Sequence, residues 1–127
     1  MTRYSKGARC ERELLSDLHS RGYSVMRSAG SGINTLSPDI IAMKSGKRLA
    51  FECKAWDSGN LSMENERFRG LLEWQSNTGM ETYVAWRMSN AGWYFIKLEE
   101  MKVNEKTTTV SKRQVLEANR RLEAIIL

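Results

Sequence analysis

The sequence predicts an α/β protein in which helices pack on the faces of a mixed β-sheet. Three segments carry apolar residues at helical spacing, and five shorter segments are apolar or aromatic runs that end at turn residues. One helical segment falls between strands, which is typical of a chain that crosses over a sheet. The length of 127 residues suits one domain, and we expect residues 1–127 to form it.

A helix followed by three strands is expected in the first part of the chain. The helix is predicted over Lys6–Arg21 with Ser5 as its N-cap. One face of it carries Ala8, Glu11, Leu14, Leu15 and Leu18. The strands are predicted at Tyr23–Ser28, Asp39–Met43 and Arg48–Lys54. Lys44–Lys47 contains Ser45 and Gly46 and predicts a tight turn between the last two strands.

The second part of the chain is expected to contain two helices and two strands. Ala55–Leu61 reads as a loop, and the segments that follow are a helix at Met63–Asn77 and strands at Glu81–Trp86 and Trp93–Leu98. A last helix is predicted over Ser111–Ile126. Its apolar stripe is made by Val115, Ala118, Leu122 and Ile126, and we expect this stripe to pack on the sheet.

The composition favours a polyanionic partner without proving one. Lys and Arg total 20 against 15 Asp and Glu, which gives a net charge of +5. No run of about 18 apolar residues predicts a membrane span, and no apolar signal segment follows Met1. We therefore expect a cytoplasmic protein without a membrane partner. Two cysteines and one histidine are too few for a disulfide framework or a zinc site.

The predicted hairpin brings two carboxylates together. If Ser45 and Gly46 are the two turn residues, Lys44 pairs with Lys47 and Asp39 lies directly opposite Glu52. Opposed residues of an antiparallel pair point to the same face. Lys54 shares that face because it lies two residues beyond Glu52. The intervening Cys53 points to the other face, which is apolar.

This arrangement predicts a divalent metal site. Two opposed carboxylates repel each other, and a bound cation turns the repulsion into binding. Glu11 is expected to join them, because it lies on the inward stripe of the first helix. A lysine beside a metal can orient or deprotonate water, or stabilise charge on a phosphorus centre. Metal-assisted phosphodiester hydrolysis fits Asp39, Glu52 and Lys54; surface carboxylates with a salt-bridging lysine are the alternative.

Several motifs resemble those of the archaeal Holliday-junction resolvases, a family of the PD-(D/E)xK nuclease class. The segments that carry the resemblance are Ser5–Leu15, Val25–Ser31, Asp39, Glu52-x-Lys54 and Gly92-Trp93. The resemblance extends from about Arg3 to Leu98. It implies a restriction-endonuclease-like fold and a homodimer that nicks four-way junction DNA symmetrically with Mg²⁺, for which Mn²⁺ can substitute. A two-fold dimer would present two equivalent sites to a junction of similar symmetry.

The same resemblance implies roles for individual residues. Glu11, Asp39 and Glu52 would be metal ligands or their supports, with the backbone carbonyl of Cys53, and Lys54 would be the catalytic lysine. Ser31 would lie near the scissile phosphate. The residues that would contact DNA phosphates are Arg12 and Arg27.

Other basic and aromatic residues have two readings. Arg3 and Lys6 form an N-terminal basic patch that either binds DNA or is simply solvated. The resemblance implies that Trp74 lies near the dimer surface, but this residue could equally belong to the core or contact DNA.

Two further functions remain open at this stage. One is a module that binds junctions without cutting them, and the other is a nuclease of the same class that acts on linear DNA. The first is disfavoured because an inactive site has no reason to keep a repulsive carboxylate pair. The second is disfavoured because the short chain carries few residues for reading bases, which suits recognition of shape.

Overall fold

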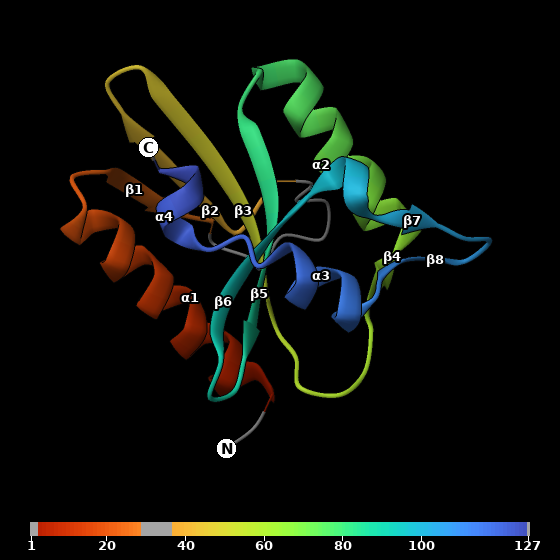
Figure 1. Cartoon of the computed structure of the whole chain (residues 1–127). Coiled ribbons are helices and arrows are strands. Elements are labelled where there is room, and N and C mark those ends of the chain that lie inside the picture. Colours follow the sequence, from red (N-terminus) through yellow and green to blue (C-terminus); the bar gives the residue numbers. More distant parts are fainter. Residues whose placement is uncertain (1–2, 29–36, 127) are drawn as a thin grey trace.

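The described part of the chain forms a larger and a smaller β-sheet with four α-helices (Figure 1). This computed structural model describes residues 3–28 and 37–126, with the backbone alone for 3–6. The helices are α1 (Arg3–Ser20), α2 (Asn65–Thr78), α3 (Lys112–Ala118) and α4 (Leu122–Ile125), with the short 3₁₀ helix η1 at Leu98–Glu100. The strands are β1 (Ser24–Arg27), β2 (Ile40–Lys44), β3 (Lys47–Ala55), β4 (Leu61–Glu64), β5 (Glu81–Met88), β6 (Gly92–Lys97), β7 (Lys102–Val103) and β8 (Thr107–Val110).

The larger sheet is mixed, as predicted. Its strand order is β1-β2-β3-β5-β6, and the β3–β5 pair is parallel while the other pairs are antiparallel. Helix α2 lies in the crossover between the parallel strands. In the β2–β3 hairpin Lys44 pairs with Lys47 and Ile40 with Phe51, so the predicted turn and register are confirmed. Gly46 makes the turn at φ +80°, a conformation that glycine adopts without steric cost.

Both faces of this sheet are covered by apolar packing. On one face, side chains of α1 and α4 pack against the sheet, and the core includes Leu14, Leu18, Phe51, Phe95 and Ile125. On the other face α2, α3 and the smaller sheet pack, and the core includes Leu61, Leu71, Val84, Trp86 and Val115. Strand alternation distributes β3 between these cores, because successive side chains point to opposite faces.

The smaller sheet was not predicted. It has the order β4-β8-β7 and lies beside α2 (Figure 1). Leu61 and Met63 are buried while Ser62 and Glu64 are exposed, so β4 has the alternation of a half-buried strand. The side chain of Asn65 anchors the β7–β8 turn, donating to the carbonyls of Asn104 and Glu105 at 2.9 and 3.1 Å.

Both ends of the chain differ from the predicted helices. Helix α1 already includes residues 3–5, so Ser5 lies inside it and is not its N-cap. The predicted C-terminal helix is divided at Asn119, whose φ of 46° and ψ of 44° end α3. The backbone carbonyl of Arg120 then accepts the N–H of Phe95 at 2.9 Å, and its guanidinium donates to the Phe95 carbonyl. The break therefore satisfies backbone groups of β6, the edge strand of the sheet.

The predicted apolar stripe is correspondingly altered. Val115 and Leu122 are buried as expected, but Ala118 is exposed and Ile125 is more deeply buried than Ile126. A single helix would have kept one stripe, whereas the break at Asn119 turns α4 onto the opposite face of the sheet from α3. Among the residues that the structure describes, no helix has the length and apolar character needed to cross a membrane.

Candidate active site at the β2–β3 hairpin

Asp39 lies at the start of β2, against the neighbouring strand. One of its carboxylate oxygens, Oδ2, accepts the backbone N–H of Cys53 at 2.8 Å. Its backbone carbonyl accepts the N–H of Ser28 at the end of β1, also at 2.8 Å. The Ser28 hydroxyl lies 3.2 Å from that of Ser37, two residues before Asp39. The position of Asp39 is thus fixed from both neighbouring strands.

Glu52 lies close to Asp39, as the hairpin register predicts. It is 5% exposed and points to the α2 face, because it is paired across β3 and β5 with the core residue Val84. Lys54 is paired with Trp86, another residue of that core, so Glu52 and Lys54 share one face as expected. Lys54 is half-buried, and the described residues provide it with no ion-pair partner.

Burial and neighbouring carboxylates make Asp39 a weak acid. Burial first, and then the negative charges of Glu52 and Glu11, raise the pKa of Asp39 to about 7, against the opposing effect of the Cys53 N–H. A hydrogen bond between the Asp39 and Glu52 side chains acts in the same direction. Asp39 therefore tends to keep its proton near neutral pH, as an acid placed close to other negative charges does. A divalent cation would replace that proton.

Glu11 approaches the hairpin from α1, on the other face of the sheet. Its carboxylate Oε1 accepts Arg27 Nε at 3.0 Å, with the two side chains 20% and 39% exposed. Its charge contributes to raising the pKa of Asp39. The predicted inward direction of Glu11 is borne out to this extent, and its partner is the arginine that the sequence had suggested for DNA.

Cys53 lies between the three carboxylates. Burial raises the pKa of its thiol, as do the charges of Asp39, Glu11 and Glu52. The side chain packs against the α1-side core, as predicted from strand alternation. In an extended strand the N–H and C=O of one residue point to the same side. The Cys53 carbonyl therefore faces the side on which Asp39 lies.

Arg67 completes the site, and the sequence reasoning missed it. Its Nε donates to Glu52 Oε2 at 2.8 Å, and its Nη2 donates to Glu52 Oε1. The same Nη2 donates to the Ser37 carbonyl at 2.8 Å. Arg67 lies in the first turn of α2, four residues before the buried Leu71, so helical spacing was the signal that could have placed it inward.

Oxygen donors of this kind suit a hard divalent cation. Asp39 and Glu52 supply them from neighbouring strands, and the raised pKa of Asp39 reflects its burial and the nearby charge of Glu52. Within residues 3–28 and 37–126, however, no three His, Cys, Asp or Glu side chains form a ready-made metal-binding group. Arg67 and Arg27 hold two of the three carboxylates instead. The donor chemistry fits a metal, and its binding requires these side chains to adjust.

The structure describes only some of the predicted DNA-binding residues. Arg12 is exposed on α1, next to Glu11 in the sequence. Trp74 is half-buried on α2, and its buried indole N–H finds no hydrogen-bond partner among the described residues. Ser31 lies outside the described residues, as do the side chains of Arg3 and Lys6.

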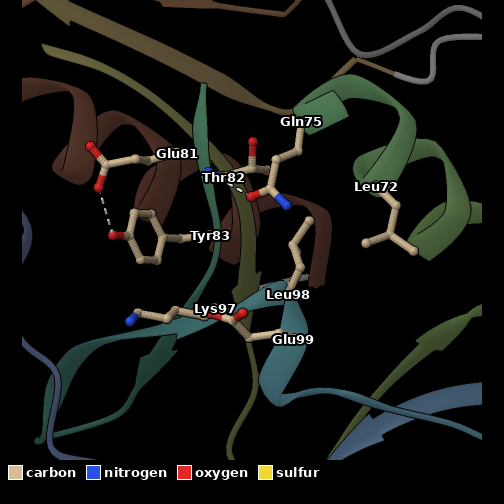
Figure 2. Close-up of a pocket in the computed structure, with 8 residues that line it drawn as sticks. All are labelled: Leu72, Gln75, Glu81, Thr82, Tyr83, Lys97, Leu98 and Glu99. Atoms are coloured by element: carbon tan, nitrogen blue, oxygen red, sulfur yellow. Dashed lines mark hydrogen bonds between the residues drawn. The ribbon is translucent and has the colours of Figure 1, made fainter. Parts of the chain in front are cut away.

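A separate hollow of about 320 Å³ lies between α2, the start of β5 and the end of β6 (Figure 2). Leu72 and Leu98 flank it, and Gln75 and Thr82 meet above it through the 3.3 Å hydrogen bond from the Thr82 N–H. The hollow contains none of the carboxylates of the hairpin site or Lys54. It is therefore no part of the carboxylate site.

Comparison with known proteins places this site in a nuclease family. The archaeal Holliday junction resolvase (Hjc) family matches residues 2–126. Crossover junction endodeoxyribonuclease Hjc of Sulfolobus acidocaldarius is 27% identical over 129 residues, covering 99% of this chain and 90% of that protein.

Solved structures agree. The Holliday junction resolvase Hjc of Archaeoglobus fulgidus superimposes with a TM-score of 0.78 and 28% identity, covering 88% of each chain. The bacterial homing endonuclease I-Ssp6803I shares the fold at a TM-score of 0.55 and 16% identity, covering 89% of this chain and 80% of that one. The fold is the restriction-endonuclease-like one that the resemblance implied, and the chain belongs to the archaeal Holliday junction resolvase family.

Proposed function

We propose that this chain is a structure-selective DNA endonuclease that resolves four-way junctions by hydrolysing phosphodiester bonds, in recombination and repair. The observation that carries the proposal is the pair of opposed carboxylates, Asp39 and Glu52, with Lys54 on the same face of β3. Its relatives are named crossover junction endodeoxyribonucleases. A divalent metal ion is indicated by the nuclease family, and Mg²⁺, with Mn²⁺ as a substitute, is the ion we propose.

Asp39 and Glu52 would hold the ion, with Glu11 as a support and the Cys53 carbonyl as a further oxygen donor. A bound divalent cation supplies Lewis-acid stabilisation of charge on the phosphate and lowers the pKa of water. The protein supplies the positioning: the Cys53 N–H fixes one oxygen of Asp39, and before metal binds the ion pair with Arg67 holds Glu52. Lys54 would orient the attacking water or stabilise the developing charge on phosphorus.

DNA binding is proposed for basic residues around the site. Arg12 is exposed and can meet a phosphate, and Arg27 is paired with Glu11, the residue before Arg12 in the sequence. Arg3 and Lys6 extend the basic segment at the start of α1. Ser31, which lies outside the described residues, is proposed to act near the scissile phosphate on the basis of the family resemblance alone.

We propose a homodimer that uses α2. Leu72 is 39% exposed on this helix, and Trp74 lies two residues further along it with an indole N–H to which residues 3–28 and 37–126 offer no hydrogen-bond acceptor. A two-fold dimer would set two sites on strands of like polarity in a junction. We also retain residues 1–127 as a single nuclease domain and the cytoplasm as its location, both on the basis of the sequence.

The test is cleavage of a labelled four-way junction and a matched linear duplex, each with Mg²⁺ and with EDTA. Asp39→Asn is the key variant. Asp17→Asn is its control, because it makes the same chemical change outside the carboxylate site, at a residue of α1 that pairs with Arg21. We expect paired, Mg²⁺-dependent nicks in the junction alone, and their loss in Asp39→Asn with binding retained.

Other results would contradict the proposal in distinct ways. Junction binding by the wild type without any nicking would leave a binding module. Equal cutting of the linear duplex would indicate a general nuclease of the same fold.

A further inference from the structure

Glu52 forms an ion pair with Arg67, and a divalent cation that binds Glu52 would be repelled by this arginine. The Glu52 and Arg67 side chains are 6% and 23% exposed, so the pair is largely shielded from water. A carboxylate at such a depth is strongly unfavourable without a cation. The pair also raises the pKa of Arg67, whose guanidinium therefore stays charged.

The fork between Arg67 and Glu52 engages both carboxylate oxygens. Each oxygen has about two acceptor sites, so a metal ion could still reach a free lone pair. The charge of Arg67, however, already balances that of Glu52. A dication brought to Glu52 would meet the guanidinium at close range, and the repulsion is substantial where water is scarce. The competition between Arg67 and the metal is therefore one of charge more than of space.

Arg67 is also placed to leave. It lies in the first turn of α2, and its side chain retains 23% exposure, so a change of rotamer that releases Glu52 and the Ser37 carbonyl would turn the guanidinium toward solvent. Arginine matches the geometry of a phosphate as well as that of a carboxylate. A DNA phosphate at the site would thus offer it an equivalent partner.

We propose that Arg67 is the internal counter-ion of Glu52, displaced by the divalent cation and then bound to a phosphate of the junction. This inference rests on the proposed function. It makes Arg67 a positioning residue that couples metal loading to DNA binding, so that the site holds metal weakly until DNA takes the guanidinium. A purely structural role would have the opposite signature, because loss of the fork would disorder Glu52 and weaken metal binding.

The direction of the change in metal affinity tests the proposal. Mn²⁺ binding to the DNA-free protein would be measured by calorimetry at pH 8 in wild type and in Arg67→Gln. The control is Arg69→Gln, the same change at an exposed position of α2. We expect Arg67→Gln to bind Mn²⁺ about tenfold more tightly and the control to match the wild type. Equal or weaker binding by Arg67→Gln overturns the proposal.

A milder variant covers the case in which Arg67→Gln fails to fold. Arg67→Lys keeps the charge but loses the fork, so it yields to the cation more easily, and we expect Mn²⁺ binding a few-fold tighter than in the wild type. Unchanged or weaker binding in this variant also overturns the proposal. Absence of Mn²⁺ binding in the wild type and in every variant would instead refute the metal site of the proposed function.

The second half of the exchange is tested by junction binding. In a Lys54→Ala background, which is expected to block cleavage, junction affinity would be measured in Mn²⁺ and in EDTA. We expect Mn²⁺ to tighten binding where Arg67 is present, because the displaced guanidinium gains a phosphate, and to tighten it less in Arg67→Gln. An equal Mn²⁺ effect in both would show that Arg67 takes no phosphate.

Discussion

Ionisation of Asp39 in the metal-free protein is expected to destabilise the fold. Its pKa is raised from 3.8 to about 7, mainly by burial and then by the charge of Glu52. Each pKa unit corresponds to about 1.4 kcal/mol. The raised pKa therefore implies that the unfolding free energy falls by about 4 kcal/mol as Asp39 goes from fully protonated to fully ionised in the folded state.

The sign follows from the two pKa values. Between about pH 4 and pH 7 the folded protein keeps the Asp39 proton while the unfolded chain has lost it. The stabilisation is thus complete at and below about pH 4, declines as the pH rises, and is lost above about pH 7. A metal ion at the site would reverse the trend, because it prefers the ionised carboxylate and competes with the proton.

The assay is urea unfolding in EDTA at a series of pH values from 4 to 8, for wild type and Asp39→Asn. The asparagine cannot ionise, yet its amide oxygen can still accept the N–H of Cys53. We expect the unfolding free energy of Asp39→Asn, relative to that of the wild type, to rise by about 4 kcal/mol from pH 4 to pH 8. Adding Mg²⁺ at pH 8 should raise the unfolding free energy of the wild type but not that of Asp39→Asn. Parallel pH profiles in EDTA would refute the reasoning.

Three further predictions concern single residues. Lys54→Ala should lower the single-turnover rate of junction cleavage by about 100-fold or more while gel-shift affinity stays unchanged; weakened binding with a normal rate would assign Lys54 to DNA instead. Arg12→Ala should weaken junction binding and reduce the slope of log affinity against log salt by about one, with no change in unfolding, because Arg12 is exposed. Asn119→Ala should lower the unfolding free energy by about 1 kcal/mol, because φ of 46° is unfavourable for alanine, whereas Asn119→Gly should be nearly neutral; equal loss in both variants would trace the effect to the side chain.

The hairpin site was predictable because its determinants are local. Two turn residues set the register of β2 and β3, and the register alone put Asp39 opposite Glu52. Strand alternation then separated Lys54 from Cys53. Helical spacing gave the direction of Glu11.

The arginine partners were less accessible, because they depend on contacts between segments distant in the sequence. Arg67 meets Glu52 only after α2 has crossed over the sheet. The helical spacing from Leu71 favours Arg67 over Arg69, but only once α2 is known to face Glu52. Arg27 was assigned to phosphate, although its present partner is Glu11. For Arg27 the sequence identified a cation but not the carboxylate that it neutralises, and Arg67 was not identified at all.

The C-terminal segment failed for a different reason. Its apolar positions suit a continuous helix, and helical propensity favours one, but Asn119 tolerates the left-handed conformation that stops it. The break is supported by Arg120, which pairs with Phe95 through its backbone and also contacts Glu100 through its guanidinium. Tertiary contacts with an edge strand thus override the local pattern.

The arginine partners and a retained proton explain how a small domain tolerates three neighbouring carboxylates. Glu11 is neutralised by Arg27, Glu52 by Arg67, and Asp39 by a proton that it retains up to about pH 7. Each negative charge therefore has its own compensation before a metal arrives, which limits the repulsion that would otherwise oppose folding. A metal ion adds net stability only by displacing these partners, so its affinity depends on how readily the proton and the guanidinium leave. The Asp39 proton leaves as the pH rises, and Arg67 leaves more readily when another anion, such as a DNA phosphate, accepts it. We therefore expect metal loading to depend on both pH and DNA.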